Sequence, residues 1–166
     1  MTVSDAIIKM ISISEGNEHD INHFLKVWGY ARTIGEAERL DERTLKTLEL
    51  AAVVHDIACP LLRKEHGSAP GGLQEKAGPD LVREFFSGSD IDADMLERIC
   101  FLVGHHHTYK GVDGLDHQIL LEADFLVNAG EQENDRKAVR SFHENVFRTQ
   151  TGLELLENIY ILSTTY

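Results

Sequence analysis

The dipeptide His55-Asp56 lies inside an apolar run, residues 50–58, and so places two groups that water solvates strongly where the sequence pattern indicates burial. Ala52 and Leu48 precede His55 by three and seven residues, so on a helix the imidazole shares their interior-facing stripe. A buried ionised carboxylate is costly unless it is paired or binds a metal, and adjacent nitrogen and oxygen donors suit a divalent cation. The dipeptide therefore predicts a metal site.

Three other apolar segments each carry one further candidate ligand. His23 lies on the same helical face as Val27, His106 continues the stripe that contains Ile99, and Asp124 interrupts a third apolar run. Any one of these residues alone is more often an ordinary core or surface residue than a ligand. Four apolar segments that each deliver an imidazole or a carboxylate favour one shared site.

Apolar residues recur at helical intervals along the chain, and no segment has the alternation of a strand. The expected helices are 3–14, 21–40, 42–58, 73–87, 92–106, 115–129, 135–148 and 151–162. We expect an all-α fold, a compact bundle of about six to eight helices. The length of 166 residues suits a single domain, 1–166.

Two breaks between the expected helices are notable. The longest, Pro60 through Gly72, follows the dipeptide directly, so it is expected to be either a lid over the site or a passive connection. The acidic cluster 131–135 is expected to form a turn before the next helix.

The order of these motifs resembles the HD-domain superfamily of metal-dependent phosphohydrolases. The segment 22–27 is similar to the first histidine motif of that family, 53–57 to its namesake dipeptide, and 121–124 to its terminal aspartate motif. The resemblance runs from about Ile21 to Asn128. It implies an HD-like core over about 21–128, on which the C-terminal helices 135–162 pack.

The resemblance implies one tightly bound divalent metal ion, held by His23, His55, Asp56 and Asp124. The family's donor set accepts Mn, Co, Ni, Fe, Zn or Mg, so the identity of the ion stays open. Family members that bind two metals often carry a histidine four residues before a glycine, and here Gln74 stands at that position before Gly78. A second ion, bound through Glu75 or His107, is left open.

The dipeptide His19-Asp20 repeats the namesake motif in a different context. The residues before it are polar, and Asp20 is expected to be the N-cap of the helix that carries His23. We therefore expect His55-Asp56, and not His19-Asp20, to bind metal.

The chemistry implied by the resemblance is hydrolysis of a small phosphorylated metabolite, with a nucleotide as the favoured class. A bound divalent ion makes hydroxide available at neutral pH and polarises a phosphoryl oxygen. Asp56 is expected to hold the ion and orient the water. Within the triplet 105–107, His106 continues the apolar stripe and is the first candidate proton donor, while His105 and His107 point roughly 100° to either side. His107 is the second candidate, and His105 is the weakest.

The formal charge of −12 argues against polymeric nucleic acid as a partner, because such binding uses basic surface. A small phosphorylated substrate needs only local positive charge. The candidate substrate-binding cations are Lys26, Arg63, Lys64 and Lys110. There is no apolar run of about 18 residues and no secretory signal pattern, so a cytoplasmic protein with no membrane partner is expected. A homodimer is left open.

Two other functional classes compete with hydrolysis. A di-iron oxygenase of the HD type would use a histidine-rich site, although Gln74 in place of a ligand disfavours it. A non-catalytic nucleotide-binding module is the other alternative, and the complete set of four core ligands disfavours it. Cys59 and Cys100 lie far apart among apolar neighbours and are expected to be buried free thiols.

Overall fold

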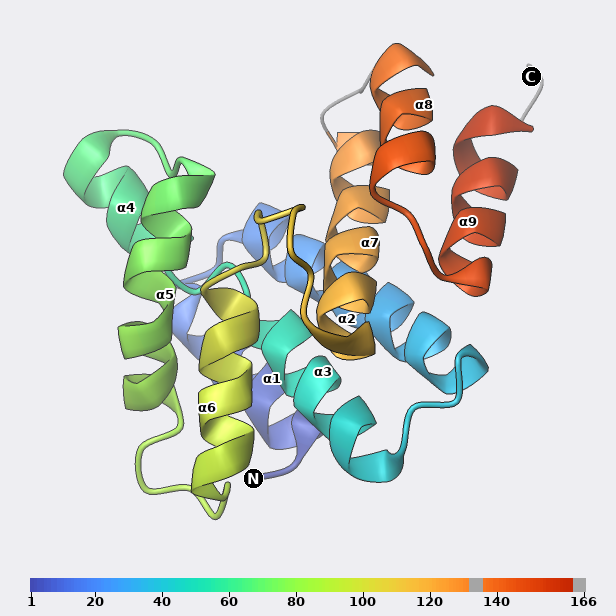
Figure 1. The fold of residues 1–166 in the computed structure, drawn as a ribbon. Helices are drawn as coiled ribbons and strands as arrows, with labels where there is room; N and C mark the ends of the chain where they lie inside the picture. The colour runs from blue at the N-terminus through green and yellow to red at the C-terminus, as the bar shows by residue number, and fades with distance from the viewer. Residues whose placement is uncertain (132–135, 163–166) are drawn as a thin grey trace.

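The computed structural model describes residues 1–131 and 136–162, which form helices and turns with no strand (Figure 1). The all-α fold expected from the sequence is confirmed. The helices are α1 (Val3–Ile13), α2 (Glu18–Ala37), α3 (Glu42–Val54), α4 (Cys59–His66), α5 (Gly71–Phe85), α6 (Ala93–Val103), α7 (Gly114–Glu131), α8 (Arg136–Asn145), α9 (Gln150–Leu156) and the π-helix η1 (Glu157–Ile161). In the expected acidic turn 131–135, Glu131 is the last residue of α7, and the rest lies outside the described residues.

Helix starts follow short polar side chains that accept hydrogen bonds from the backbone of the first turn. Asp41 accepts from the N–H groups of Arg43 and Thr44 at the start of α3, and Asp92 accepts from Met95 at the start of α6. Such caps pair N–H groups that have no partner within the helix. They explain why the sequence pattern located these two helix starts to within one residue.

The expectation that Pro60 through Gly72 is a break between helices is wrong for most of this segment. Residues Cys59–His66 form α4, with Pro60 in its first turn and Gly67 as its C-cap at a φ of 74°. Proline suits the first turn of a helix because its missing N–H group would have no partner there, and glycine adopts positive φ without strain. Pro60 and Gly67, two residue types that are typical of loops, therefore mark the two ends of a short helix.

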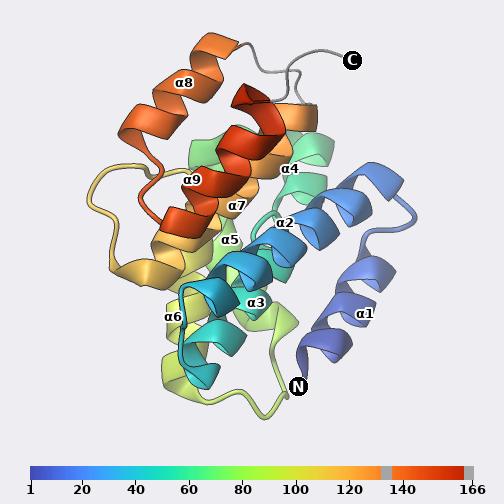
Figure 2. The ribbon, with the colours of Figure 1, turned by 90° about the vertical axis from the view of Figure 1, so that its right-hand side faces the viewer.

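Helix α3 is the central element of the bundle. It packs against α1, α2, α6 and α7, and α2 also packs along α7, as Figures 1 and 2 show. Their shared core is apolar and includes Phe24 of α2, Leu50 of α3 and Leu120 of α7, each at most 1% exposed. Because α2, α3 and α7 meet, polar residues placed on their inner faces are brought together.

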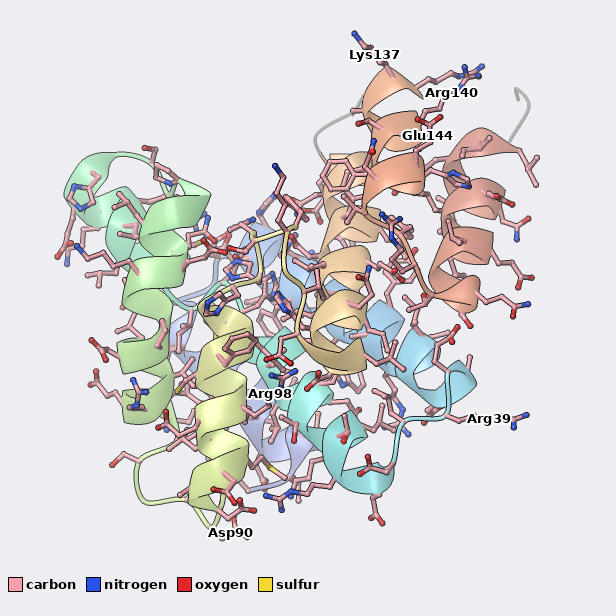
Figure 3. The ribbon with its side chains drawn as sticks, in the orientation of Figure 1. Arg39, Asp90, Arg98, Lys137, Arg140 and Glu144 are labelled. Carbon is pink, nitrogen blue, oxygen red and sulfur yellow. The ribbon has the colours of Figure 1, made fainter. Side chains whose placement is uncertain are left out.

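Buried ionic side chains anchor α7 at two points. Near its start, Arg98 of α6, labelled in Figure 3, donates hydrogen bonds to both carboxylate oxygens of Asp116, at 2.8 and 2.6 Å. Further along, Glu122 is fully buried and accepts hydrogen bonds from the backbone N–H groups of Arg148 and Thr149, at 2.7 and 3.0 Å. Since Thr149 is the N-cap of α9, Glu122 joins α7 to the C-terminal helices.

The C-terminal helices lie on one side of α2, and α1 lies on the other side (Figure 2). Lys137 and Arg140 project outward from α8 at one end of the molecule (Figure 3). None of the described helices combines the length and apolar character that a membrane span requires. Cys59 and Cys100 are both buried free thiols, as expected.

Candidate metal centre

Three helices place a cluster of nitrogen and oxygen donors at one point. His23 comes from α2, His55 is the C-cap of α3, and Asp124 lies on α7. The Nε2 atom of His23 lies 3.2 Å from Nε2 of His55 and 3.3 Å from Oδ1 of Asp124. The Nε2 atom of His55 lies 3.5 Å from the same aspartate oxygen. All three side chains are at most 7% exposed, so the cluster is a buried polar site.

Asp56, which follows the C-cap, completes this cluster and extends it toward the histidine triplet. Its Oδ2 atom lies 3.6 Å from Nε2 of His23, and its Oδ1 atom lies 3.6 Å from Nε2 of His55 and 3.4 Å from Nε2 of His106. Two groups of donors result, and each has its ligand atoms within 4.8 Å of one another. The first group is His23, His55 and Asp56, and the second is Asp56, His106 and His107.

Hydrogen bonds to the outer ring nitrogens orient the histidines. The Nδ1 atom of His55 lies 2.8 Å from the carbonyl oxygen of Ala52, and Nδ1 of His106 lies 2.7 Å from that of Val103. A carbonyl oxygen can only accept, so each Nδ1 carries the hydrogen and each Nε2 is left to act as a ligand. In both cases the acceptor carbonyl lies three residues earlier in the chain, so the local backbone turns Nε2 of each ring toward the site.

The electrostatics of the cluster also fit a cation. Burial alone would lower the pKa of His23, but the hydrogen bond with Asp124 and the charge of Asp56 outweigh burial and raise the pKa to about 9. Burial would raise the pKa of both aspartates, yet the neighbouring histidines hold these pKa values below their usual range. The buried Asp124 and the partly buried Asp56 thus need positive charge beside them, which a divalent ion bound by these residues would supply.

Within the histidine triplet, two side chains face the site and one does not. His106 is fully buried and His107 is partly buried, and the Nε2 atom of each lies 3.2 Å from Oε1 of Gln74. The Nε2 atom of Gln74 donates to the carbonyl oxygen of Ala69 at 2.6 Å, which fixes Oε1 toward the histidines. The ring of His105 instead stacks on Phe101, away from these groups.

Gln74 therefore occupies the place beside the second donor group. Its amide oxygen lies within hydrogen-bonding distance of Nε2 of both His106 and His107. Glu75, considered from the sequence as a ligand of a second ion, accepts from the backbone N–H of His107 at 3.0 Å and from Thr108 Oγ1 at 2.9 Å. Glu75 thus holds the loop of the triplet in place, while Gln74 reaches the donor atoms.

A pocket with a volume of about 300 Å³ opens onto the donors. Its walls are built by α2, α4, the turn before α5, α5, α7 and the histidine triplet. The lining residues are His19, Asp20, His23, Asp56, Cys59, Arg63, Ser68, Ala69, Gln74, His107, Asp124, Asn128 and Glu131.

The four cations proposed from the sequence lie in different surroundings. Arg63 lines the pocket and forms an ion pair with Asp20. Lys26 pairs with Glu131 at 2.9 Å. Lys64 and Lys110 are exposed and are not among the lining residues.

The structure corrects the interpretation of Asp20. The N-cap of α2 is Asn17, whose Oδ1 atom accepts from the backbone N–H of Asp20, because the helix begins at Glu18 instead of residue 21. Asp20 lies in the first turn and its carboxylate pairs with Arg63. His19-Asp20 lines the rim of the pocket, whereas His55-Asp56 lies among the donors.

Two residues of the site have no counterpart in the sequence-based set. Glu131 accepts a hydrogen bond from Nδ1 of His23 at 2.8 Å, and Asn128 donates from Nδ2 to Oδ1 of Asp124 at 2.8 Å. Asn128 and Glu131 follow Asp124 by four and seven residues, so the three share one face of α7. This spacing is the signal in the sequence that could have located them.

An all-α domain with a buried histidine and aspartate cluster at the base of a pocket defines a candidate metal-dependent enzyme. The family model of the HD domain matches residues 20–149, which is most of the chain, and the protein belongs to the HD-domain family. Membership places it in a superfamily of metal-dependent phosphohydrolases. No curated protein and no solved structure matches the chain.

Proposed function

We propose that the protein is a metal-dependent phosphohydrolase that cleaves a small phosphorylated metabolite, with a nucleotide as the favoured class. The observation that carries this proposal is the convergence of His23, His55, Asp56 and Asp124, whose donor atoms meet at separations of 3.2 to 3.6 Å. Membership of the HD-domain family supports it. The complete donor set argues against a degenerate binding module.

The size and polarity of the pocket support a small anionic substrate. A volume of about 300 Å³ is at the lower end of the range for small-molecule sites. Arg63 is the lining residue that carries a permanent positive charge, and its guanidinium can hold two oxygens of a phosphate. Asp20 holds this guanidinium at the rim.

The residues divide into binding and catalytic roles. His23, His55, Asp56 and Asp124 would hold one divalent ion, which supplies activated water and polarises a phosphoryl oxygen when bound. Asp56 faces the pocket with 28% of its side chain exposed, so its carboxylate can accept a hydrogen bond from the attacking water and orient it. His106 and His107 lie on the other side of Asp56, where His107 lines the pocket and His106 is fully buried. We assign the transfer of a proton to the leaving oxygen to this pair.

Protonation of the two triplet histidines separates their roles. Burial alone would lower the pKa of His106, but the hydrogen bond with Asp56 outweighs it and raises the pKa. Burial and the neighbouring His106 lower the pKa of His107. His106 is therefore the better proton donor, and neutral His107 is the better hydrogen-bonding or ligand group.

The experiment that tests the proposal is a screen of phosphomonoesters and phosphodiesters for phosphate release. Purified protein is stripped of metal and reloaded in turn with Mn²⁺, Co²⁺, Ni²⁺ or Mg²⁺, and the metal content of each sample is measured. We expect metal-dependent turnover of at least one nucleotide by the wild type and not by Asp56→Asn. Absence of metal-dependent hydrolysis in fully loaded samples across the screen would contradict the proposal.

The second donor group favours one competing function. Because Asp56 reaches both groups, two ions could share its carboxylate, with His106, His107 and the amide oxygen of Gln74 on the second ion. Two irons so bound would permit oxidation of a substrate by oxygen. Iron content, colour and oxygen consumption of protein purified without added metal distinguish this function from hydrolysis.

A further inference from the structure

Among the histidines whose Nε2 atom faces the donors, His23 differs in how it is held. His55 and His106 donate from Nδ1 to carbonyl oxygens three residues earlier in the chain, so their orientation is set by the local backbone. The Nδ1 atom of His23 is bonded to Glu131 on another helix, 108 residues away in sequence. The orientation of the His23 ring thus depends on the Glu131 side chain, and therefore on whatever holds Glu131 in place.

Glu131 is itself fixed by a second partner. One carboxylate oxygen, Oε2, lies 2.8 Å from Nδ1 of His23, and the other, Oε1, lies 2.9 Å from Nζ of Lys26. His23 and Lys26 are three residues apart and lie on the same face of α2, opposite the end of α7. His19 adds a third nitrogen, 3.7 Å from Oε2. The carboxylate therefore has its position set by α2 on both oxygens.

The surroundings give this arrangement more weight than an ordinary surface ion pair. The side chain of Glu131 is only 16% exposed and that of His23 only 7%, whereas Lys26 is 54% exposed. The carboxylate of Glu131 therefore accepts from Nδ1 of His23 in a place that is largely shielded from water.

A carboxylate on the outer nitrogen of a histidine ligand does two things. It fixes the tautomer and the ring orientation, and it increases the basicity of the nitrogen that faces the metal. Loss of such a partner typically lowers metal affinity by roughly 10- to 100-fold. The geometry of His23, Glu131 and Lys26 meets the conditions for this effect, because Nε2 of the same ring lies 3.3 Å from Asp124 and 3.6 Å from Asp56.

We propose that Glu131 is a positioning residue of the metal centre, which holds Nε2 of His23 toward the other ligands while Lys26 holds Glu131. This inference rests on the metal site of the proposed function. It gives Lys26 a role in the affinity for metal, and it leaves Arg63 as the lining cation for the substrate. His55 and His106 do not share this dependence, because their rings are held by backbone carbonyl oxygens.

The test is a measurement of Co²⁺ affinity by competition with a chelator, together with the visible absorption of the bound Co²⁺. Glu131→Ala removes the acceptor, and we expect the dissociation constant for Co²⁺ to rise roughly 10- to 100-fold. Glu131→Gln keeps an acceptor oxygen but loses the charge, so a smaller rise is expected. Lys26→Met leaves Glu131 in place and should give the smallest rise of the three.

The matched control is Glu97→Gln. Glu97 accepts hydrogen bonds from Nε and Nη2 of Arg83, at 3.3 and 2.9 Å, and so forms an ion pair between two helices without touching a ligand. Its removal should leave the affinity for Co²⁺ unchanged. Thermal unfolding of the metal-free proteins distinguishes a structural role of Glu131 from a role in metal binding. If Glu131 were only structural, its variants would have a lower melting temperature but the wild-type affinity for Co²⁺.

Each outcome decides the proposal. Unchanged Co²⁺ affinity in Glu131→Ala, or in Glu131→Gln and Lys26→Met should the alanine variant not fold, overturns the role of Glu131 and leaves the proposed function intact. A wild-type protein that binds no Co²⁺, Mn²⁺ or Zn²⁺ overturns the metal site itself. Graded loss in the order alanine, glutamine and Lys26→Met, with Glu97→Gln unchanged, supports the positioning role.

Discussion

The Oδ1 atom of Asp56 lies 3.4 Å from the Nε2 atom of His106, so one carboxylate joins two groups of metal donors. His23 and His55 lie on one side of this carboxylate, and His106 and His107 lie on the other. No other residue in the described part of the chain belongs to both groups. A change at Asp56 therefore disturbs the metal and the proton donor together.

Asp56→Asn should abolish most of the hydrolytic activity. The substitution keeps the size of the side chain but removes the charge that attracts the cation, and it replaces one of the two acceptor oxygens with an NH2 donor. We expect phosphate release to fall by at least roughly 10- to 100-fold, which is typical even for residues around the ligands. Asp94→Asn, an exposed carboxylate on α6, is the control and should retain full activity. A folded Asp56→Asn protein with full metal-dependent activity would exclude the assigned role.

Removal of metal should lower thermal stability. The proposed ion is held by two carboxylates and two histidines, and an ion that binds only the folded state stabilises that state by about 2.7 kcal/mol when its concentration is 100 times the dissociation constant. We expect the melting temperature of metal-loaded protein to fall after chelation and to recover on reloading. His55→Ala should show no response to either treatment. An unchanged melting temperature after complete removal, verified by elemental analysis, would show that the cluster does not depend on metal.

Sequence patterns indicated the side chains that the structure brings together because each of them lies within a local apolar segment. His23 shares a helical face with the buried Val27, and Asp124 lies within a buried segment of α7. Burial at helical spacing is a local property, so it can be read from neighbouring residues. That α2, α3 and α7 meet at these residues follows from the family's fold, which the motif order indicated.

Residues that act through tertiary contacts were not predicted. Glu131 gains its role from His23, which lies 108 residues earlier, and nothing in the acidic sequence around it indicates that partner. In the sequence, Pro60 indicates a break because proline inside a helical pattern usually ends the helix. The structure places it in the first turn of α4, where its lack of an N–H group has no cost.

Asp92→Asn should weaken the pH dependence of the free energy of unfolding in the acid range. Hydrogen bonds from Arg43 and from the backbone of Met95 lower the pKa of Asp92 from 3.8 to about 2. A carboxyl group whose pKa falls on folding stabilises the folded state at pH values above its pKa in the unfolded chain. This contribution is lost as the pH falls through its pKa in the folded protein. Asparagine keeps a capping oxygen for α6 but cannot carry the charge that pairs with Arg43.

The measurement for Asp92 is the urea midpoint of wild type and variant as a function of pH. We expect the variant to have the lower midpoint at pH 7 and the difference to shrink between about pH 4 and pH 2. Asp80→Asn removes a carboxylate that is 91% exposed and should give a much smaller difference. A difference for Asp92→Asn that is constant over this pH range would mean that the charge is not its cause.

The two His-Asp dipeptides should respond differently to mutation, since one lies among the donors and the other at the rim of the pocket. His55→Ala should abolish stoichiometric binding of Co²⁺, because it removes a nitrogen, Nε2, that lies 3.2 Å from Nε2 of His23 and 3.5 Å from Oδ1 of Asp124. Asp20→Asn should leave the metal content unchanged. Its carboxylate pairs with Arg63, so the variant should instead raise KM for the phosphorylated substrate by about 2- to 5-fold, as expected for a partly exposed ion pair, with little change in kcat. Metal titration and steady-state kinetics of the two purified variants decide the matter. Equal loss of metal in both variants, or loss only in Asp20→Asn, would show that the assignment of the metal site to His55-Asp56 is wrong.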